Sequence, residues 1–174
     1  MSKSKPVVDL DVEAVIADMA TRLKQFLKAS KRSKPLIVGV HTGGVWVAHA
    51  LHEALGLGEA VGELNIAFYR DDFSRIGMHP TVSPSNLPVA VEDRHLVLVD
   101  DILYSGRTVR AAMNEIFDYG RPASITLAVL IDREERDLPI RADIVGATMQ
   151  LAAGEHVKLT GPQPMKLELS KVGA

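Results

Sequence analysis

The segment from His95 to Met113, HLVLVDDILYSGRTVRAAM, constrains the fold more than any other stretch of the chain. Leu96–Val99 is an unbroken apolar run, which is typical of a strand buried on both faces of a parallel sheet. Asp100 and Asp101 follow where such a strand would leave the sheet, and a helical pattern begins after Thr108. The order of strand, acid pair, polar turn and helix therefore predicts a unit whose loop binds a ligand.

The polar turn has the composition expected of a phosphate site. Helix amino termini present unpaired N–H groups and the positive end of the helix dipole, so they attract phosphate. Gly106 lets the backbone approach an anion closely because it has no side chain. The hydroxyl and guanidinium donors beside it are Ser105, Arg107 and Thr108. Carboxylates only accept hydrogen bonds, which suits ribose hydroxyls, so the predicted ligand is a phosphorylated sugar with a free diol.

Two further strands are expected to end at the same edge of the sheet. The β-rich run Leu36–Val40 ends at His41 and is followed by two glycines and a helical pattern. The apolar run Ser124–Ile131 ends at Asp132. Because ligands of open α/β sheets gather outside the carboxyl ends of the strands, the exits at His41, Asp100 and Asp132 should converge on one crevice.

Four other segments have recognisable patterns. An amphipathic helix capped by Asp11 is expected from Asp9 to Lys28. Apolar and polar residues alternate in Glu63–Tyr69, which predicts a half-exposed strand. A long proline-containing loop follows this strand and reaches Val89. The basic segment Lys28–Lys34 is interpreted as a solvated helix end, with nucleic acid contact as the alternative. Apolar and polar residues also alternate in the tail His156–Leu169, which predicts one small strand.

Length and composition fit a folded globular protein. The chain has 174 residues, 47% of them hydrophobic, and no cysteine. A chain of this length can bury a substantial core as a single domain, without a disulfide framework. The net charge of −2 provides no global field that recruits nucleic acid, although a local patch could. The polar amino terminus and the absence of a membrane-length apolar run predict a cytoplasmic protein.

VLVDDILYSGRT resembles the 5-phosphoribosyl-1-pyrophosphate (PRPP) signature of type I phosphoribosyltransferases. Within that superfamily, the chain resembles the PyrR family, which comprises uracil phosphoribosyltransferases that also regulate pyrimidine operons by attenuation. The segments that carry this narrower resemblance are VGVHTGGVWVA, FYRDDFSRIG, DYGRPASITLAVLIDR and DLPIRADIVG. The resemblance implies an α/β type I phosphoribosyltransferase fold, in which helices flank a mainly parallel central sheet. It further implies one domain over residues 1–174, with a flexible lid hairpin and a small C-terminal hood from about residue 134.

The resemblance also implies roles for individual residues. Asp100 and Asp101 would hold the ribose side of PRPP, and Arg75 of the lid would reach the pyrophosphate on closure. Arg133 and Val157 would lie at the base. The implied 5-phosphate cradle is Tyr104, Ser105, Gly106, Arg107 and Thr108, and the implied pyrophosphate loop is Thr42, Gly43 and Gly44.

The implied reaction joins N1 of uracil to C1 of PRPP, which gives UMP and releases pyrophosphate. Mg²⁺ prefers oxygen ligands and retains waters, so the substrate itself should hold most of the metal, with no dedicated protein ligand. Purine-specific relatives have an acidic residue where Tyr104 stands. Without a carboxylate near the ring, a purine would lose a proton acceptor, which favours a pyrimidine substrate.

Evidence for regulation through RNA is thinner. Arg136 and Arg141, both expected to be solvated, match basic positions of the family's RNA face and are candidates for contact with a pyr mRNA leader. Two other parts of the family's RNA-binding pattern are missing, however, because the chain has no histidine before His41 and no lysine or arginine in the segment 146–156. Two alternatives to the enzyme remain open: an RNA-binding regulator that senses UMP or PRPP with little turnover, and a non-enzymatic partner module. A phospho-acceptor receiver domain would explain the acids but not the second glycine loop. Family precedent suggests a homodimer or homotetramer.

Overall fold

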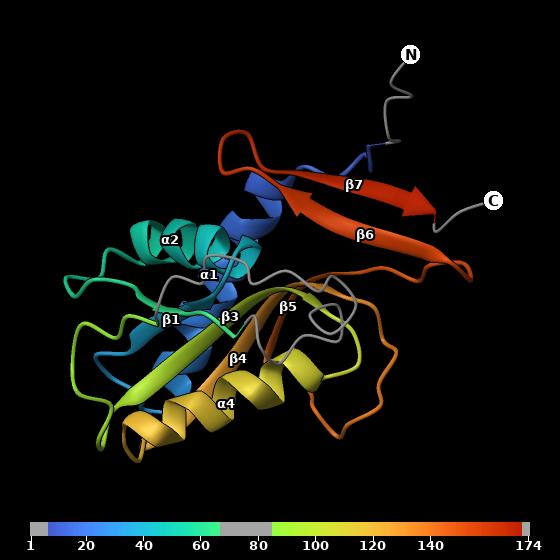
Figure 1. Ribbon diagram of the computed structural model, residues 1–174. Coiled ribbons are helices and arrows are strands. Elements are labelled where there is room, and N and C mark those ends of the chain that lie inside the picture. Colours follow the sequence, from blue (N-terminus) through green and yellow to red (C-terminus); the bar gives the residue numbers. More distant parts are fainter. Residues whose placement is uncertain (1–6, 67–84, 172–174) are drawn as a thin grey trace.

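The computed structural model describes residues 7–66 and 85–171, and their arrangement is an α/β fold built on a parallel sheet (Figure 1). Five strands lie in the order β2-β1-β3-β4-β5, and every neighbouring pair is parallel. They are β1 (Leu36–Val40), β2 (Gly62–Leu64), β3 (His95–Leu103), β4 (Ser124–Asp132) and β5 (Ile144–Thr148). Parallel pairing places all carboxyl ends at one edge, as the sequence predicts.

Helices cover both faces of this sheet. Helices α1 (Val12–Ala29) and α2 (Gly43–Leu55) pack on one face, and α4 (Arg107–Tyr119) packs on the other (Figure 1). Strand side chains alternate between the two layers, so that Val97 and Val99 face α1 and α2 while Leu96 and Leu98 face the α4 side. Burial on both faces explains why these strands are apolar runs and do not alternate with polar residues.

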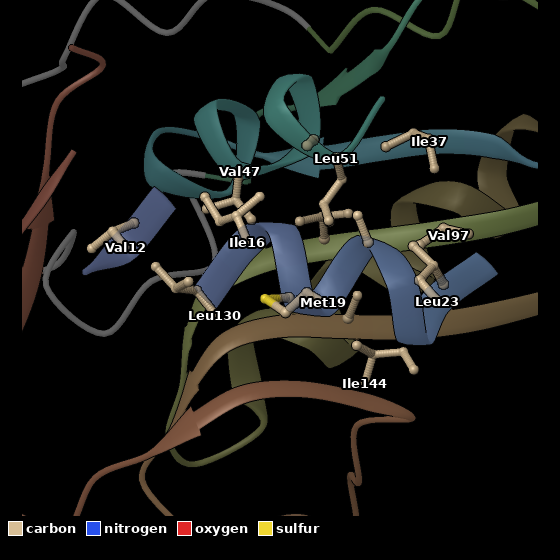
Figure 2. Packing of buried hydrophobic residues seen from close by; sticks show 14 of the residues in the cluster. Val12, Ile16, Met19, Leu23, Ile37, Val47, Leu51, Val97, Leu130 and Ile144 are labelled. Atoms are coloured by element: carbon tan, nitrogen blue, oxygen red, sulfur yellow. The ribbon is translucent and has the colours of Figure 1, made fainter. Parts of the chain in front are cut away.

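Helix α1 shows how the amphipathic pattern becomes packing. The Asp11 carboxylate caps the helix by accepting a hydrogen bond from the N–H of Ala14 at 3.0 Å. Its apolar stripe lies against the sheet and α2, where Met19 and Leu23 are fully buried (Figure 2). The helix ends at Ala29 with Lys28 in its last turn, but Arg32 of the connector is not fully solvated as expected, because its Nη1 donates to Oγ1 of Thr126 at 2.5 Å.

The structure departs from the sequence predictions in three elements. Strand β3 continues to Leu103, so the two acids lie within the strand and not beyond its end. Burial alternates from Gly62 to Ile66, but the hydrogen-bonded strand β2 has only three residues. The rest of the predicted strand and the predicted lid, including Arg75, lies outside the described residues. The tail forms two strands in place of the single one expected, because two prolines interrupt its alternating pattern between residues 160 and 166.

These two strands, β6 (Glu155–Thr160) and β7 (Lys166–Lys171), form an antiparallel hairpin apart from the main sheet. Leu159 and Leu167 are buried and join the core cluster of α1, which anchors the hairpin above the carboxyl edge of the sheet (Figure 1). The amino-terminal segment also contacts it, since the N–H of Val8 donates to the carbonyl of Leu167 at 2.9 Å. The hairpin is thus a sheet of its own, whereas β5, which also follows residue 134, belongs to the central sheet.

Described residues before and after the gap at 67–84 are hydrogen-bonded to one another. Glu63 and Asn86 exchange two backbone hydrogen bonds of 2.8 Å, and the N–H of Asn65 donates to Oγ of Ser85 at 2.9 Å. The hydroxyl of Ser85 also hydrogen-bonds the Glu115 carboxylate of α4. Within the described residues, no helix has both the length and the apolar character needed to cross a membrane.

Candidate active site

A cavity of about 330 Å³ opens at the carboxyl edge of the sheet. The continuous segment from Asp100 to Val109 forms most of its wall, and residues from the end of β4 and the start of β6 complete it. Nearly all the residues that the sequence singled out in the PRPP signature therefore line one space. The full lining is Asp100, Asp101, Ile102, Leu103, Tyr104, Ser105, Gly106, Arg107, Thr108, Val109, Arg133, His156 and Val157.

The acid pair is fixed by hydrogen bonds to the strand itself. Oδ1 of Asp100 accepts from the N–H of Asp101 at 3.0 Å, and Oδ1 of Asp101 accepts from the N–H of Ile102 at 2.9 Å. Asp100 is only 2% exposed, whereas Asp101 is partly exposed to the cavity. The two carboxylates thus differ in access, and Asp101 is the one better placed to meet a ligand's hydroxyl groups.

The glycine turn before α2 lies directly against these acids. A β-carbon on Gly43 would collide with the Asp101 carboxylate, 2.7 Å from its Cγ. A β-carbon on Gly44 would lie 2.7 Å from the carbonyl oxygen of Val99. Real side chains do not tolerate such distances, so the absence of side chains at both positions lets the backbone of this turn reach the acid pair. Thr42 caps α2 without a side-chain hydrogen bond to the helix.

The amino terminus of α4 lies at the other end of the segment, where the 5-phosphate cradle is expected. Gly106 has φ +91°, a left-handed conformation that favours glycine, and it provides no side-chain cap to the helix. Oγ of Ser105 accepts from the N–H of Arg107 at 3.2 Å. The Arg107 guanidinium and Asp137 form an exposed pair at 3.6 Å, and such surface pairs are weak enough to exchange for a phosphate. The helix terminus can therefore receive an anion.

Tyr104 and Arg133 form the opposite wall. The guanidinium of Arg133 lies over the Tyr104 ring, 4.0 Å from its centroid, in a cation–π contact. Arg133 is 7% exposed, and its Nη2 donates to Glu135 at 3.0 Å. Among the residues that the structure describes, no acceptor faces its buried Nε–H. A buried donor without a partner costs stability, so this N–H is suited to a ligand acceptor.

The structure changes the interpretation of several side chains. Arg136 is not solvated as expected, because its guanidinium is held by five protein acceptors, whereas Arg141 is exposed. His41 turns to Glu63, with Nε2 and Oε2 2.8 Å apart, and is not among the residues that line the 330 Å³ cavity. His156 lines the cavity beside Val157, although the sequence analysis did not single it out. The sequence did contain an indication of this position, because His156 is the first residue of the alternating tail and directly precedes Val157, which was expected to lie at the base.

Comparison with known proteins places this geometry in a family. Residues 10–160 match the phosphoribosyl transferase domain model. The Bifunctional protein PyrR of Nitrosococcus oceani is 56% identical over 167 residues, which cover 95% of this chain and 94% of that protein. The Bifunctional protein PyrR of Pseudomonas fluorescens is 59% identical over 155 residues, covering 89% and 92%.

Solved structures support the fold at lower identity. A hypoxanthine phosphoribosyltransferase of Trypanosoma cruzi has a TM-score of 0.68 at 19% identity, covering 97% of each chain. An HGPRT-ase of Leishmania tarentolae solved with GMP has a TM-score of 0.64 at 24% identity, covering 87% of this chain and 84% of that one. The predicted type I phosphoribosyltransferase fold and enzyme class are confirmed, and the chain belongs to the PyrR family of phosphoribosyl transferase domain proteins.

Proposed function

We propose that the chain transfers the 5-phosphoribosyl group of PRPP to N1 of uracil, giving UMP and pyrophosphate. The observation that carries this proposal is the cavity that joins the acid pair of β3 to the amino terminus of α4. A phosphorylated ribose requires acceptors for its hydroxyls and donors for its phosphate, and the cavity offers each at opposite ends. Membership of the PyrR family supports uracil as the base.

In this reaction the bond between C1 of the ribose and the pyrophosphate oxygen breaks, and the electron pair leaves with the pyrophosphate. The bond between C1 and N1 of uracil forms, and the N1 proton is lost. The ribose carbon becomes oxocarbenium-like, so the fixed negative charge of Asp101 stabilises it on the ribose side. Neither step needs a protein nucleophile, and positioning and electrostatics supply the rate enhancement.

The pyrophosphate end is assigned to the glycine turn and the lid. Backbone N–H groups of Thr42, Gly43 and Gly44 would hold the leaving group beside Asp101, an assignment that the close approach of Gly43 to the acids supports. Arg75 would add positive charge on closure. Mg²⁺, held mainly by the substrate's diol and pyrophosphate next to the acid pair, would supply further charge to the leaving group.

The base is assigned to the wall formed by Arg133 and Val157. The buried Nε–H of Arg133 can donate to a uracil carbonyl, which would give that donor its missing partner. The Tyr104 ring over this guanidinium presents no carboxylate to accept a purine proton. We therefore assign pyrimidine specificity to this wall, because the fold alone, which is shared with hypoxanthine enzymes, does not decide the base.

Regulation of pyrimidine-operon expression through RNA is the second function that the family assignment supports. Among the two arginines matched to the RNA face, Arg141 is exposed and is the one that could meet a phosphate backbone. On the precedent of the family, we further propose that the protein forms a homodimer or homotetramer in the cytoplasm. The alternative of a UMP-sensing regulator without turnover is less well supported, because the relatives at 56% and 59% identity are both named Bifunctional protein PyrR.

The test is PRPP-dependent conversion of labelled uracil to UMP with Mg²⁺, with hypoxanthine and orotate as control bases. Turnover of uracil alone is the expected result. Turnover of hypoxanthine would contradict the base assignment. An absence of turnover with any base, combined with measurable UMP binding, would make the sensing regulator the better account.

A further inference from the structure

Arg136 lies in the loop after β4, and all three nitrogens of its guanidinium form hydrogen bonds within the protein. Its Nη2 donates to both carboxylate oxygens of Asp132, at 2.7 and 2.8 Å. Its Nη1 donates to the carbonyls of Tyr104 and Glu135, at 3.1 and 2.8 Å, and its Nε donates to the carbonyl of Ile140 at 2.9 Å. Each of the three guanidinium nitrogens therefore donates to at least one acceptor of the protein.

These acceptors belong to the parts that shape the cavity. Asp132 ends β4, and Tyr104 begins the turn that leads to α4. The side chains of Arg136 and Asp132 are 21% and 13% exposed, so the pair is largely removed from water and holds its geometry better than a surface pair. Through one side chain, the end of β4 and the start of the phosphate turn are therefore joined.

The same loop supports the phosphate turn at two more points. The carbonyl of Ser105 accepts from the N–H groups of Asp137 and Leu138, both at 3.0 Å. A β-carbon on Gly106 would lie 2.9 Å from Cγ1 of Ile140, so the turn packs tightly on this loop. Arg136 itself fixes the loop through Ile140, and so it also sets the surface on which Gly106 rests.

We infer that Arg136 is a positioning residue of the PRPP site: it holds the turn of residues 104–108 in the geometry that receives the 5-phosphate. The inference rests on the proposed assignment of that turn as the phosphate cradle. It replaces the family-based expectation that Arg136 contacts RNA, because a guanidinium whose three nitrogens all donate within the protein must give up internal hydrogen bonds to bind an external phosphate in the usual two-point geometry. Arg141, which is exposed, is the matched comparison.

The experiment compares the wild-type protein with the variants Arg136→Lys, Arg136→Ala and Arg141→Ala. Steady-state kinetics with uracil give kcat and the KM for PRPP, and calorimetry gives the Kd of PRPP independently of turnover. Both Arg136 variants should raise KM and Kd for PRPP about ten- to hundred-fold, with a smaller change in kcat, because a misplaced cradle weakens the ground-state contact first. Arg141→Ala should leave all three values unchanged.

Two further measurements separate positioning from a general loss of folding. In Arg136→Lys the positive charge is kept, but a single ammonium group cannot reach all of these acceptors at once. In Arg136→Ala, added ethylguanidinium should occupy the space left by the side chain and restore the affinity for PRPP. Where Arg136→Ala fails to fold, Arg136→Lys and Asp132→Asn provide the test, and their effects on the Kd of PRPP should not multiply in the double variant, since they remove one interaction.

If Arg136→Lys bound PRPP with the same Kd as the wild-type protein, the inference would be overturned. This outcome would be clearest if the variant also lost affinity for a labelled transcript of the protein's own pyrimidine-gene leader. A wild-type protein that binds PRPP but does not turn over uracil would count against the proposed function and leave the binding test decisive. Failure of the wild type to bind PRPP would overturn both.

Discussion

Gly43 and Asp101 approach each other so closely that a β-carbon at residue 43 would overlap the carboxylate. The two residues come from different elements, since Gly43 opens α2 and Asp101 lies near the end of β3. The acid pair and the glycine turn therefore form one closely packed surface.

The first prediction concerns this approach. Gly43→Ala should lower kcat/KM for PRPP and uracil by about a hundred-fold, because the methyl group displaces either the turn or the carboxylate by roughly an ångström. Steady-state kinetics provide the measurement. Gly58→Ala is the matched control, since nothing lies within 4 Å of a β-carbon there. Equal activity of the two variants would show that the contact does not matter to the reaction.

The second prediction concerns the charge of Asp101. Asp101→Asn keeps the shape of the side chain but removes one charge-assisted contact, worth about 1.5–3 kcal/mol, so activity should fall about ten- to hundred-fold. The exposed Asp118 of α4 gives the control variant Asp118→Asn, which should retain wild-type rates. Unchanged UMP synthesis in Asp101→Asn would refute the role given to the acids.

The third prediction separates backbone strain from ligand binding. Gly106 and Gly154 both have positive φ, at +91° and +76°, so alanine at either position should cost about 1–2 kcal/mol in the free energy of unfolding. Only Gly106→Ala also meets Ile140 and lies at the cradle, so only this variant should lose PRPP affinity. Urea unfolding and calorimetry measure the two effects. PRPP binding that weakens equally in both variants would contradict the assignment.

The fourth prediction concerns the packing of α1 on the sheet. Leu23 is fully buried in the cluster of Figure 2, so Leu23→Ala should reduce the free energy of unfolding by about 2–5 kcal/mol. Lys24→Ala changes the exposed neighbour and should stay within about 0.5 kcal/mol of the wild type. Denaturant titrations compare them, and a similar midpoint for both variants would exclude the packing account.

The fifth prediction concerns acid and the β6–β7 hairpin. The pKa of Glu155 lies below its ordinary value of 4.5, first because the N–H of Ala152 donates to the carboxylate and then because Lys171 pairs with it. A lowered pKa in the folded state stabilises the hairpin above about pH 4.5 and loses this effect as the pH falls through the lowered value. The protection factors of hairpin amides, which compare the observed exchange rate with the intrinsic rate at the same pH, should therefore fall below that pH. In Glu155→Gln this loss of protection on acidification should be absent. If protection depended on pH in the same way in both proteins, the prediction would be wrong.

Much of the site could be predicted because its residues are contiguous. The signature from Leu96 to Thr108 contains a strand, two acids and a helix start, and each has its own chemical pattern. The two loops that join it come from other parallel strands, whose exits must share an edge. The lengths of β2 and β3 were less predictable, because hydrogen-bonded pairing, which the burial pattern does not reveal, sets where a strand ends.

The role of Arg136 was not predictable from the sequence. Three of its acceptors are main-chain carbonyls, which every residue has, so no side-chain pattern marks them. The stacking of Tyr104 on Arg133 is similar, since it joins residues 29 positions apart through the packing of two strand ends. Sequence patterns indicate which residues carry chemistry, whereas partners drawn from backbone atoms require the folded arrangement.

The parallel sheet has a consequence for the protein during its synthesis on the ribosome. β5 is the last strand of the central sheet to be made, and within the described residues it alone pairs with the outer edge of β4. A nascent chain that stalls before Ile144 would present β4 as an open edge, and its residues Leu127–Ile131 are apolar and buried in the finished sheet. Such edges pair readily with other chains. Escape from aggregation in the cell thus depends on completing a five-residue strand that supplies none of the groups in the cavity.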